Sequence, residues 1–389
     1  MNKDINMKVN VLPVLTYNFL HVNDSILNAG DITIDSFSSP KEASLPEGIA
    51  VKRDISFEEA GEVFRKNKDK ILKTTGVPGT PNGDMAYRDE KQALRTGMGI
   101  DIDELMTSVD VKATVYTIPE GKKAKEPIIL KYDLGSGQGN LSAQVIHARK
   151  DSEVTVIMEY VSEKEAAGFH GVSTRLLAEE GAKITLVKVQ LLGNEFIHFD
   201  DIGAACFEGG QVDLVSLELG AKKSWTGCYT NLVGKESVFN SNMGYLCRDD
   251  HMLDINYVAD HRGKKTNALM QFKGVLMDTA SKTFRGTIDF KNGSSGSAGD
   301  EQEDALLLSP DVVNKTMPVI LCQEEDVDGR HGATIGQLGE DILFYMQSRG
   351  IDEDEAKRIM IKARLESVAR MIPDPEIMQR VQYFIQGIV

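Results

Sequence analysis

Apolar and polar residues alternate most clearly in the middle of the chain. In the stretch SEVTVIMEY, Val154, Val156, Met158 and Tyr160 occupy every second position. This spacing places all four side chains on one face of a strand. The stretches GAKITLVKVQ and GQVDLVSLEL repeat the pattern, and each follows a short apolar strand and a charged or glycine-containing turn. We therefore expect strands from about 105 to 325.

The strand segments return at a nearly constant interval. The anchor residues Val154, Ile184, Val212 and Val238 are separated by 30, 28 and 26 positions. A period of this size indicates stacked units that bury their apolar faces against one another. Because no helical stretch separates the strands, the pattern favours a β-helix over a βαβ sheet. A two-sheet sandwich stays open as the alternative, since regular spacing does not exclude it.

The beginning of the chain has a helical pattern instead. Ser56 and Glu59 form a capping box that predicts a helix to about Lys73. A second helix is expected over 85–97, where a glycine ends it. We therefore interpret residues 1–104 as a mixed, mainly helical region.

The end of the chain, 338–389, is predicted to be a helical domain. A first helix spans 340–348 and is ended by Gly350. Asp352 is the expected cap of a second helix, and Asp374, followed by a proline, that of a third. The last helix is apolar enough to need a partner surface on this chain or on another.

These patterns divide the chain into three parts, with the β-helix core over 105–337 between the two helical regions. One stretch within the core departs from the strand pattern. The segment KNGSSGSAGDEQED, at 291–304, has almost no apolar content. Such composition is typical of mobile loops, and we expect one here.

Charge and cysteine content narrow the class of protein. The net charge of −15 argues against nucleic acid or an anionic membrane as a partner, since both need clustered Lys and Arg. No apolar run approaches the ~20 residues of a membrane-spanning helix, and the first residues lack the apolar core of a signal peptide. The four cysteines form no C-x-x-C pair, which favours a reduced compartment. We expect a cytoplasmic protein.

Candidate chemical motifs are weak. The sequence GSGQGN, at 135–140, lacks the P-loop pattern and is interpreted as a turn. Cys247 and His251 supply half of a metal site without a recognisable second half. Cys322 is interpreted as a buried small hydrophobe, and its acidic neighbours disfavour a thiolate. His331, in a Gly/Thr-rich turn, is either a satisfied turn histidine or a functional one. Nothing in these residues demands an enzyme.

The stretch HGATIGQLGEDILFYMQSRGI, beginning at His331, resembles the signature of the SufB/SufD family. Members of that family are scaffold subunits of the SUF iron–sulfur cluster assembly machinery. The segments YTIPEGKKAKEPIILKY, DHRGKKTNALMQFKGVLMDTASKTFRGTI and ALLLSPDV agree with the resemblance, as does LTYNFLHVN near the start. It implies a right-handed parallel β-helix with a helical N-terminal region and a helical C-terminal domain. It also implies pairing of two scaffold subunits near His331.

Two positions resemble SufD more than SufB. SufB-like chains carry Glu directly after the histidine and a cysteine roughly thirty residues upstream. Here those positions are Gly332 and Glu303. The resemblance therefore implies a cluster-assembly interface formed by His331, Gly332 and Thr334, at which a neutral imidazole ligates iron or moves a proton. Cys322 is a further ligand candidate.

The resemblance also implies partners. A SufC-like ABC ATPase is expected to dock on the C-terminal helices, at Phe344, Tyr345, Arg349 and Gly350. The second scaffold subunit is a SufB-like chain or a second copy of this chain. No intrinsic cofactor is expected. We do expect a transient iron–sulfur cluster, or iron, at the subunit interface. The alternative is a β-solenoid enzyme acting on a carbohydrate polymer, which would need paired carboxylates and aromatic platforms.

Overall fold

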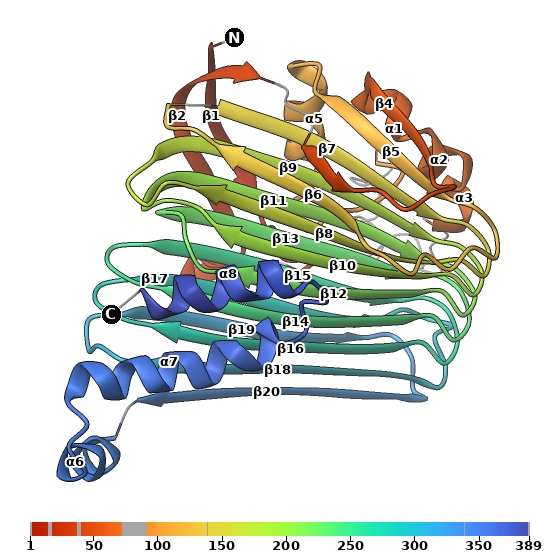
Figure 1. Cartoon of the computed structure of the whole chain (residues 1–389). Helices are drawn as coiled ribbons and strands as arrows, with labels where there is room; N and C mark the ends of the chain where they lie inside the picture. Colours follow the sequence, from red (N-terminus) through yellow and green to blue (C-terminus); the bar gives the residue numbers. More distant parts are fainter. Residues whose placement is uncertain are drawn as a thin grey trace.

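The computed structural model describes residues 2–14, 18–36, 40–71, 92–137, 139–337 and 339–387. Its centre is a β-solenoid in which the chain alternates between two facing sheets (Figure 1). The first, here called the odd sheet, contains β7 (Gly139–Ala148), β9 (Ala167–Ala178), β11 (Glu195–Cys206), β13 (Lys223–Leu232), β15 (Met252–His261), β17 (Ser281–Phe290) and β19 (Val313–Cys322). The second, the even sheet, contains β6 (Ile128–Leu134), β8 (Glu153–Ser162), β10 (Lys183–Leu191), β12 (Gln211–Glu218), β14 (Val238–Cys247), β16 (Asn267–Leu276), β18 (Ser297–Leu307) and β20 (Val327–Gln337).

Parallel pairing within both sheets confirms the solenoid and excludes the sandwich. Val154 of β8 pairs with Ile184, which pairs with Val212, which pairs with Phe239, and all four are buried. The fourth anchor predicted from the sequence, Val238, is wrong by one residue. Val238 pairs with Gln211 and faces away from the interior, because a shift of one position moves a strand residue to the other face.

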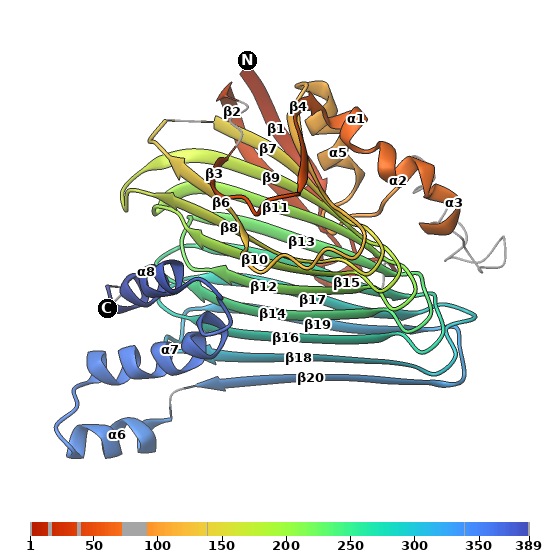
Figure 2. The same ribbon diagram turned by 45° about the vertical axis from the view of Figure 1, so that its right-hand side comes forward.

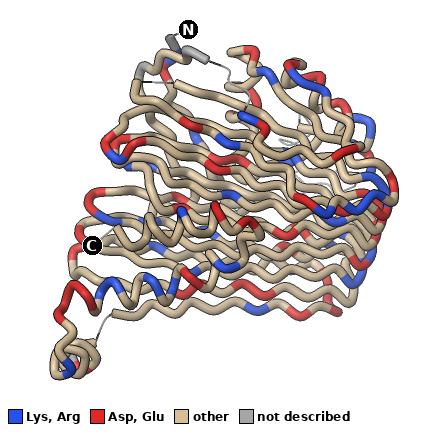
Figure 3. Tube along the Cα trace, viewed as in Figure 1, with Lys and Arg blue, Asp and Glu red and all other residues tan. Residues whose placement is uncertain are grey.

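A stacked turn closes the coils along one edge of the solenoid. Its backbone enters the left-handed region at one position in each of five successive coils: Asp151, Gly181, Gly209, Glu236 and Lys265. At Gly181 the N–H donates to the carbonyl of Glu208 in the next coil at 2.8 Å, and the other turns bond similarly. Lys150 and Glu180 form an ion pair of 2.8 Å between neighbouring turns. Charges of both signs therefore lie along this edge (Figure 3).

The segment 291–304 is not the expected mobile loop. Its second half belongs to β18, which pairs in parallel with β16 and β20. The prediction failed because two interior-facing positions of this strand are occupied by Glu301 and Glu303, both of them buried. Low apolar content here marks polar side chains inside the solenoid.

The N-terminal region is mostly strand, so the prediction of a helical region is wrong. β1 (Asn2–Val9) and β2 (Ser25–Ser36) form an antiparallel hairpin beside β7, β3 (Lys41–Ser44) pairs with β6, and β4 (Ala50–Ser56) pairs with β5 (Lys112–Ile118). The helices are short: η1 (Asn18–Leu20), α1 (Phe57–Ala60), α2 (Glu62–Lys66), α3 (Lys68–Ile71) and α5 (Ile100–Ser108). These strands pair with the first coils, and those tertiary contacts outweigh local helix signals.

Two details of the N-terminal prediction have different outcomes. The cap at Ser56 is confirmed, because its hydroxyl accepts from the backbone N–H of Glu59 at 3.1 Å. The helix that it begins is broken into α1, α2 and α3 and ends at Ile71 in the described chain. The second predicted helix, 85–97, lies mostly outside the described residues, and its described part, 92–97, is not helical.

Three helices follow the solenoid, as predicted: α6 (Glu340–Ser348), α7 (Glu353–Ala369) and α8 (Pro375–Gln386). Asp352 caps α7 by accepting from Glu355 N at 2.8 Å, and Asp374 caps α8 by accepting from Ile377 N at 2.8 Å. Figure 2 shows α7 and α8 lying across the even sheet.

The partner surface that α8 needs is on this chain. Ile377, Val381 and Ile385 are buried in an apolar cluster that also contains outward-facing residues of the even sheet, such as Val189. Arg380 of α8 donates to both carboxylate oxygens of Glu159, at 2.6 and 2.8 Å. Apolar burial and this bidentate ion pair together fix α8 to the solenoid.

Candidate functional site

The last coil of the solenoid, formed by β19 and β20, differs from all earlier coils. Each of these strands ends the spatial order of its sheet, so in the described part of the chain no strand pairs with its outer edge. Almost every residue of β20 is exposed, whereas the strands one coil earlier are largely buried. This uncovered coil, here called the open end, presents both edge backbone groups and interior-facing side chains.

His331 lies in the middle of β20 and not in a turn, which corrects the sequence interpretation. It pairs in register with Glu301 of β18. Because paired residues of parallel strands share a face, the His331 side chain lies on the interior side, above Glu301. Gly332 and Thr334 point to the opposite face by the same alternation, and neither shapes a turn. The three predicted interface residues are thus on one strand but not on one face.

The two interior carboxylates beneath β20 have different surroundings. Glu303 is ion-paired with Lys282 of β17 and accepts hydroxyl hydrogen bonds from Tyr245, at 2.9 Å, and from Thr316, at 2.6 Å. Glu301 is 1% exposed, and in the described structure neither carboxylate oxygen has a hydrogen-bond partner. Burial, with the nearby charge of Glu303, raises the pKa of Glu301 to about 8.

Glu303 occupies the position at which the resemblance places a cysteine in SufB-like chains. The structure gives it a structural role, since its three partners come from both sheets and from the last coil. Through these contacts Glu303 anchors the final coil to the coils before it.

Cys322 is exposed, so the prediction of a buried small hydrophobe is wrong. It ends β19 in register with the buried Phe290 of β17. The interior face of β19 has no further coil above it, which leaves the thiol accessible. Its Sγ donates to the carbonyl of Glu324 at 3.0 Å. Cys206, Cys228 and Cys247 are buried, and burial raises the pKa of each thiol, which keeps them protonated.

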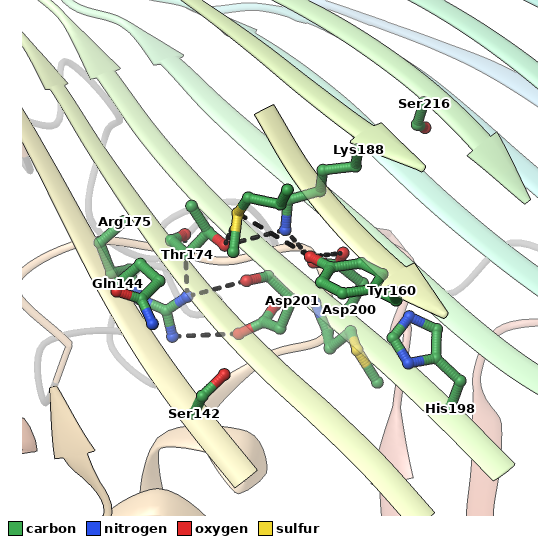
Figure 4. A network of polar contacts seen from close by, with 12 residues as sticks. Ser142, Gln144, Tyr160, Thr174, Arg175, Lys188, His198, Asp200, Asp201 and Ser216 are labelled. Carbon is green, nitrogen blue, oxygen red and sulfur yellow. Dashed lines mark hydrogen bonds and ion pairs between the residues drawn. The ribbon is translucent and has the colours of Figure 1, made fainter. Parts of the chain in front are cut away.

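The earlier coils also contain buried charge, and one buried ion pair there joins Lys188 and Asp200. Figure 4 shows Lys188 and Tyr160 converging on Asp200, with Thr174 beside the lysine. The Lys188 ammonium forms an ion pair with Asp200 and donates to the Thr174 hydroxyl at 2.8 Å. The Tyr160 hydroxyl donates to the second Asp200 oxygen at 3.2 Å. This cluster links the two sheets through the interior.

The next residue in sequence forms a second buried pair on the outer face of the odd sheet. Asp201 accepts from the Arg175 guanidinium at 3.0 Å and from the backbone N–H of Met98 at 2.9 Å. Arg175 also bonds Asp103 of α5. Burial raises the pKa of Asp201 to about 6 against the opposing effect of Arg175. The pair attaches the N-terminal region to the solenoid.

The interior histidines do not form a metal centre. His170 and His198 stack with ring centroids 5.1 Å apart, and burial lowers both pKa values, that of His198 to about 4. Cys247 and His251 line one narrow cavity with Glu218 and Ser224. No group of three or more His, Cys, Asp or Glu side chains suited to a metal occurs among the residues described.

The predicted SufC-docking residues belong to α6 and the turn after it. Phe344 and Tyr345 are 73% and 58% exposed, and Arg349 lies over the Tyr345 ring at 5.3 Å. Gly350 has φ +82°, a left-handed conformation that glycine adopts without strain, and it ends α6 before α7 begins. α6 touches α7 and extends beyond the solenoid (Figure 1).

Glu301 and the Lys188–Asp200 pair were not predicted from the sequence. The available signal was the alternation itself. Inward positions one coil apart can be aligned from the anchor residues, and charged residues at such positions are buried.

No helix in the described ranges is long and apolar enough to cross a membrane.

Comparisons with known proteins give a consistent result. A family model described as "SUF system FeS cluster assembly, SufBD core domain" matches residues 133–364. The iron-sulfur cluster assembly protein SufD of Bacillus subtilis is 24% identical over 292 residues, covering 73% of this chain and 66% of that protein. SufD of Escherichia coli is 22% identical over 308 residues, covering 77% and 72%. The chloroplastic SufBD family protein ABCI8 of Arabidopsis thaliana is 24% identical over 378 residues, covering 93% and 64%. Because the family model matches more than half of the residues, this chain belongs to the SufBD core domain family of the SUF iron–sulfur cluster assembly system.

Proposed function

We propose that this chain is a SufD-like scaffold subunit of a cytoplasmic SUF complex and is not itself an enzyme. It pairs with a SufB-like subunit, or with a second copy, through the open end, and it docks a SufC-like ATPase through its C-terminal helices. Family membership supports the scaffold role, since SufBD proteins are generally non-catalytic. The carbohydrate-enzyme alternative has no support from the family match.

The observation that carries the proposal is the open end itself. β19 and β20 offer two edges to a partner, and the interior-facing Ile335 is 50% exposed at the same place. Natural sheets usually cover or charge such edges, so an uncovered coil with apolar and ligand side chains is suited to an interface. His331 is within this surface and would face the partner's residues.

Docking of the ATPase is proposed at α6. Its exposed aromatics, with Arg349, form an amphipathic patch of the kind enriched in interface centres. α7 and α8 are fixed to the even sheet, so force applied to α6 by an ATP-driven partner would reach the solenoid through them. Coupling of this kind requires two arrangements with different affinity for nucleotide-bound ATPase.

The docking proposal is tested by co-purification of the full chain with a SufC-like ATPase. The double variant Phe344→Ala/Tyr345→Ala should weaken the complex by at least about a hundredfold, the range of two interface hot spots. The matched control is Tyr383→Ala on α8, because Tyr383 is 79% exposed but outside the patch. Equal retention of the ATPase by the double variant would refute docking at α6.

The cluster-assembly role is tested separately at His331. His331→Ala should lower the yield of transient iron–sulfur cluster in an anaerobic reconstitution with a SufB-like subunit, while the native mass of the pair stays unchanged. Because His331 is exposed, the substitution should leave the fold of the isolated chain intact. Unchanged cluster yield would return His331 to a structural role.

A further inference from the structure

The loop between β1 and β2 carries two apolar side chains that the proposed function does not use. Phe19 is 93% exposed and Leu20 is 57% exposed, both on η1. These two residues are here called the tip. A single exposed apolar residue is ordinary on a protein surface, so the meaning of the tip depends on where the fold holds it.

The loop crosses the outer face of the odd sheet in the direction of the open end. Before η1, the Asn10 amide donates to the Asp254 carboxylate of β15 at 2.7 Å. After η1, Arg285 of β17 donates to the carbonyls of Val22, at 2.7 Å, and Asp24, at 2.9 Å. η1 ends two residues before Val22, and that length of chain spans at most about 7 Å. The tip is therefore held within two strand spacings of β17, the strand that pairs with β19.

Buried contacts fix the loop to the solenoid. Arg285 is 1% exposed, and its guanidinium also donates to Asp254 at 2.6 Å. Directly after the loop, the indole of Trp225 donates to the Ser25 hydroxyl at 2.9 Å. A tip that the fold already holds in place loses little conformational entropy when another molecule covers it, which favours binding.

The strand next to this loop has a mostly apolar outer face. Met317 of β19 pairs in register with Arg285 and therefore faces the same side. It is 5% exposed although no described strand lies beyond β19, which agrees with a loop that reaches β19. Alternation places Val313, Val319 and Leu321 on the same face, and Val313 is 47% exposed. This side of the open end thus carries an exposed apolar tip and an exposed apolar strand residue.

We propose that the tip docks on the outer face of β19 in a second copy of this chain. This docking rests on the proposed pairing through the open end, with a second copy as the partner. In a twofold pair both subunits use the same surface, so one chain must carry both halves of each contact. This chain does so, with Phe19 and Leu20 as one half and the face around Val313 as the other. A partner of another sequence would need only one half on this chain.

The docking is tested by sedimentation equilibrium of the full chain alone, without ATPase or a SufB-like subunit. The wild type should form a dimer. Phe19→Ser/Leu20→Ser should raise the dimer Kd at least about a hundredfold, because each pair contains two tips and loss of an interface anchor costs about tenfold or more. Val313→Lys on the receiving face should raise the Kd at least about tenfold. Combined with the tip variant, Val313→Lys should add less than its separate effect, because the two halves touch.

A matched control and a second measurement separate docking from general effects. Tyr383→Ser removes another exposed aromatic side chain, 79% exposed on α8, which covers the even sheet. It should keep the wild-type Kd within about twofold. In addition, p-benzoylphenylalanine at position 19 should give covalent dimers on illumination, crosslinked within residues 313–322 of the second copy. The same group at position 383 should give none.

Three results would overturn the docking: a wild type that stays monomeric at its highest soluble concentration, a tip variant with the wild-type Kd, or no covalent dimer crosslinked within 313–322. The crosslink carries the test alone if the tip variant fails to fold. Ile335→Lys, which changes the open end itself, separates this docking from the proposed pairing. Dissociation by Ile335→Lys with unchanged pairing of the tip variant would reject the docking and leave the proposed function standing. The reverse result would reject edge pairing through β19 and β20 and leave the tip contact standing.

Discussion

The two ends of the solenoid solve the problem of edge strands differently. At the beginning, β3 pairs antiparallel with β6 and β4 pairs antiparallel with β5, while the β1–β2 hairpin lies beside β7. At the other end, β19 and β20 have no such cover in the described chain. The unpaired edge of a parallel coil can form hydrogen bonds with a strand of another molecule. The beginning of the solenoid is protected against such association, whereas the open end is available for it.

The pairing of buried charged side chains also differs along the solenoid. In the covered coils, Lys188 and Asp200 neutralise each other inside the solenoid. In the last covered coil before the open end, Glu303 forms an ion pair with Lys282, but Glu301 has no ion pair or hydrogen-bond partner among the described residues. Buried carboxylates of the solenoid therefore differ in how far residues of this chain compensate them.

The largest expected effect tests the covered coils. Lys188→Met removes the cation and leaves the Asp200 carboxylate buried beside Tyr160. Removal of one partner of a buried ion pair costs about 3–5 kcal/mol of unfolding free energy. Urea denaturation of the full chain measures it. The double variant Lys188→Met/Asp200→Asn should recover part of the loss, since no unpaired charge remains. A loss below about 1 kcal/mol would contradict the idea that these coils depend on paired charge.

A smaller, pH-dependent effect is expected at Glu218 in the middle of the solenoid. Burial raises the pKa of Glu218 to about 8 from its ordinary value of 4.5. The folded state therefore holds this proton more tightly than the unfolded chain, and stability falls as pH rises from about 4.5 to 8. Glu218→Gln removes that loss.

Denaturant titrations across this pH range measure the effect. The variant should match the wild type near pH 4 and exceed it above pH 8, by up to a few kcal/mol. The sign is opposite to that of Lys188→Met, because here the substitution removes an uncompensated charge. Parallel pH profiles for the two proteins would show that a bound cation or water already compensates the Glu218 carboxylate.

The solenoid could be predicted from the sequence because its strand pattern is visible within short segments and recurs in each coil. Alternation identified interior faces, and the near-constant interval identified stacking; the error at Val238 was a single position. The N-terminal strands could not be predicted in the same way. They are short, and they are ordered by pairing with coils far away in sequence, such as β3 with β6. A capping signal such as Ser56 was correctly interpreted, but it begins only a few helical residues.

The candidate site was predicted in part. His331 was identified through a family resemblance, because its spacing alone did not distinguish a structural histidine from a functional one. Glu301 was missed because the polar segment around it resembles a loop, although it continues the inward register of β16. Cys322 was expected to be buried because a free cysteine usually behaves as a small hydrophobic residue. Its exposure follows from the position of β19 as the last strand of its sheet, which composition does not reveal.

The smallest effect on stability, and the sharpest test of the open end, is expected at Ile335. Its side chain is on the interior face of β20 and 50% exposed. Ile335→Lys should change the unfolding free energy of the isolated chain by less than about 0.5 kcal/mol, as for other surface substitutions. The same change should weaken pairing of scaffold subunits at least about tenfold, or 1.4 kcal/mol, because the ammonium would be buried without a partner.

The matched control is Ile342→Lys on α6. Ile342 is 51% exposed, and α6 is not part of the proposed pairing surface. Native mass measurements without ATPase should show dissociation for Ile335→Lys and an intact pair for Ile342→Lys. Equal behaviour of the two variants would mean that the pairing surface is elsewhere. The open end would then stay exposed to solvent without contacting the second subunit. The difference between the two ends of the solenoid would have no role in assembly.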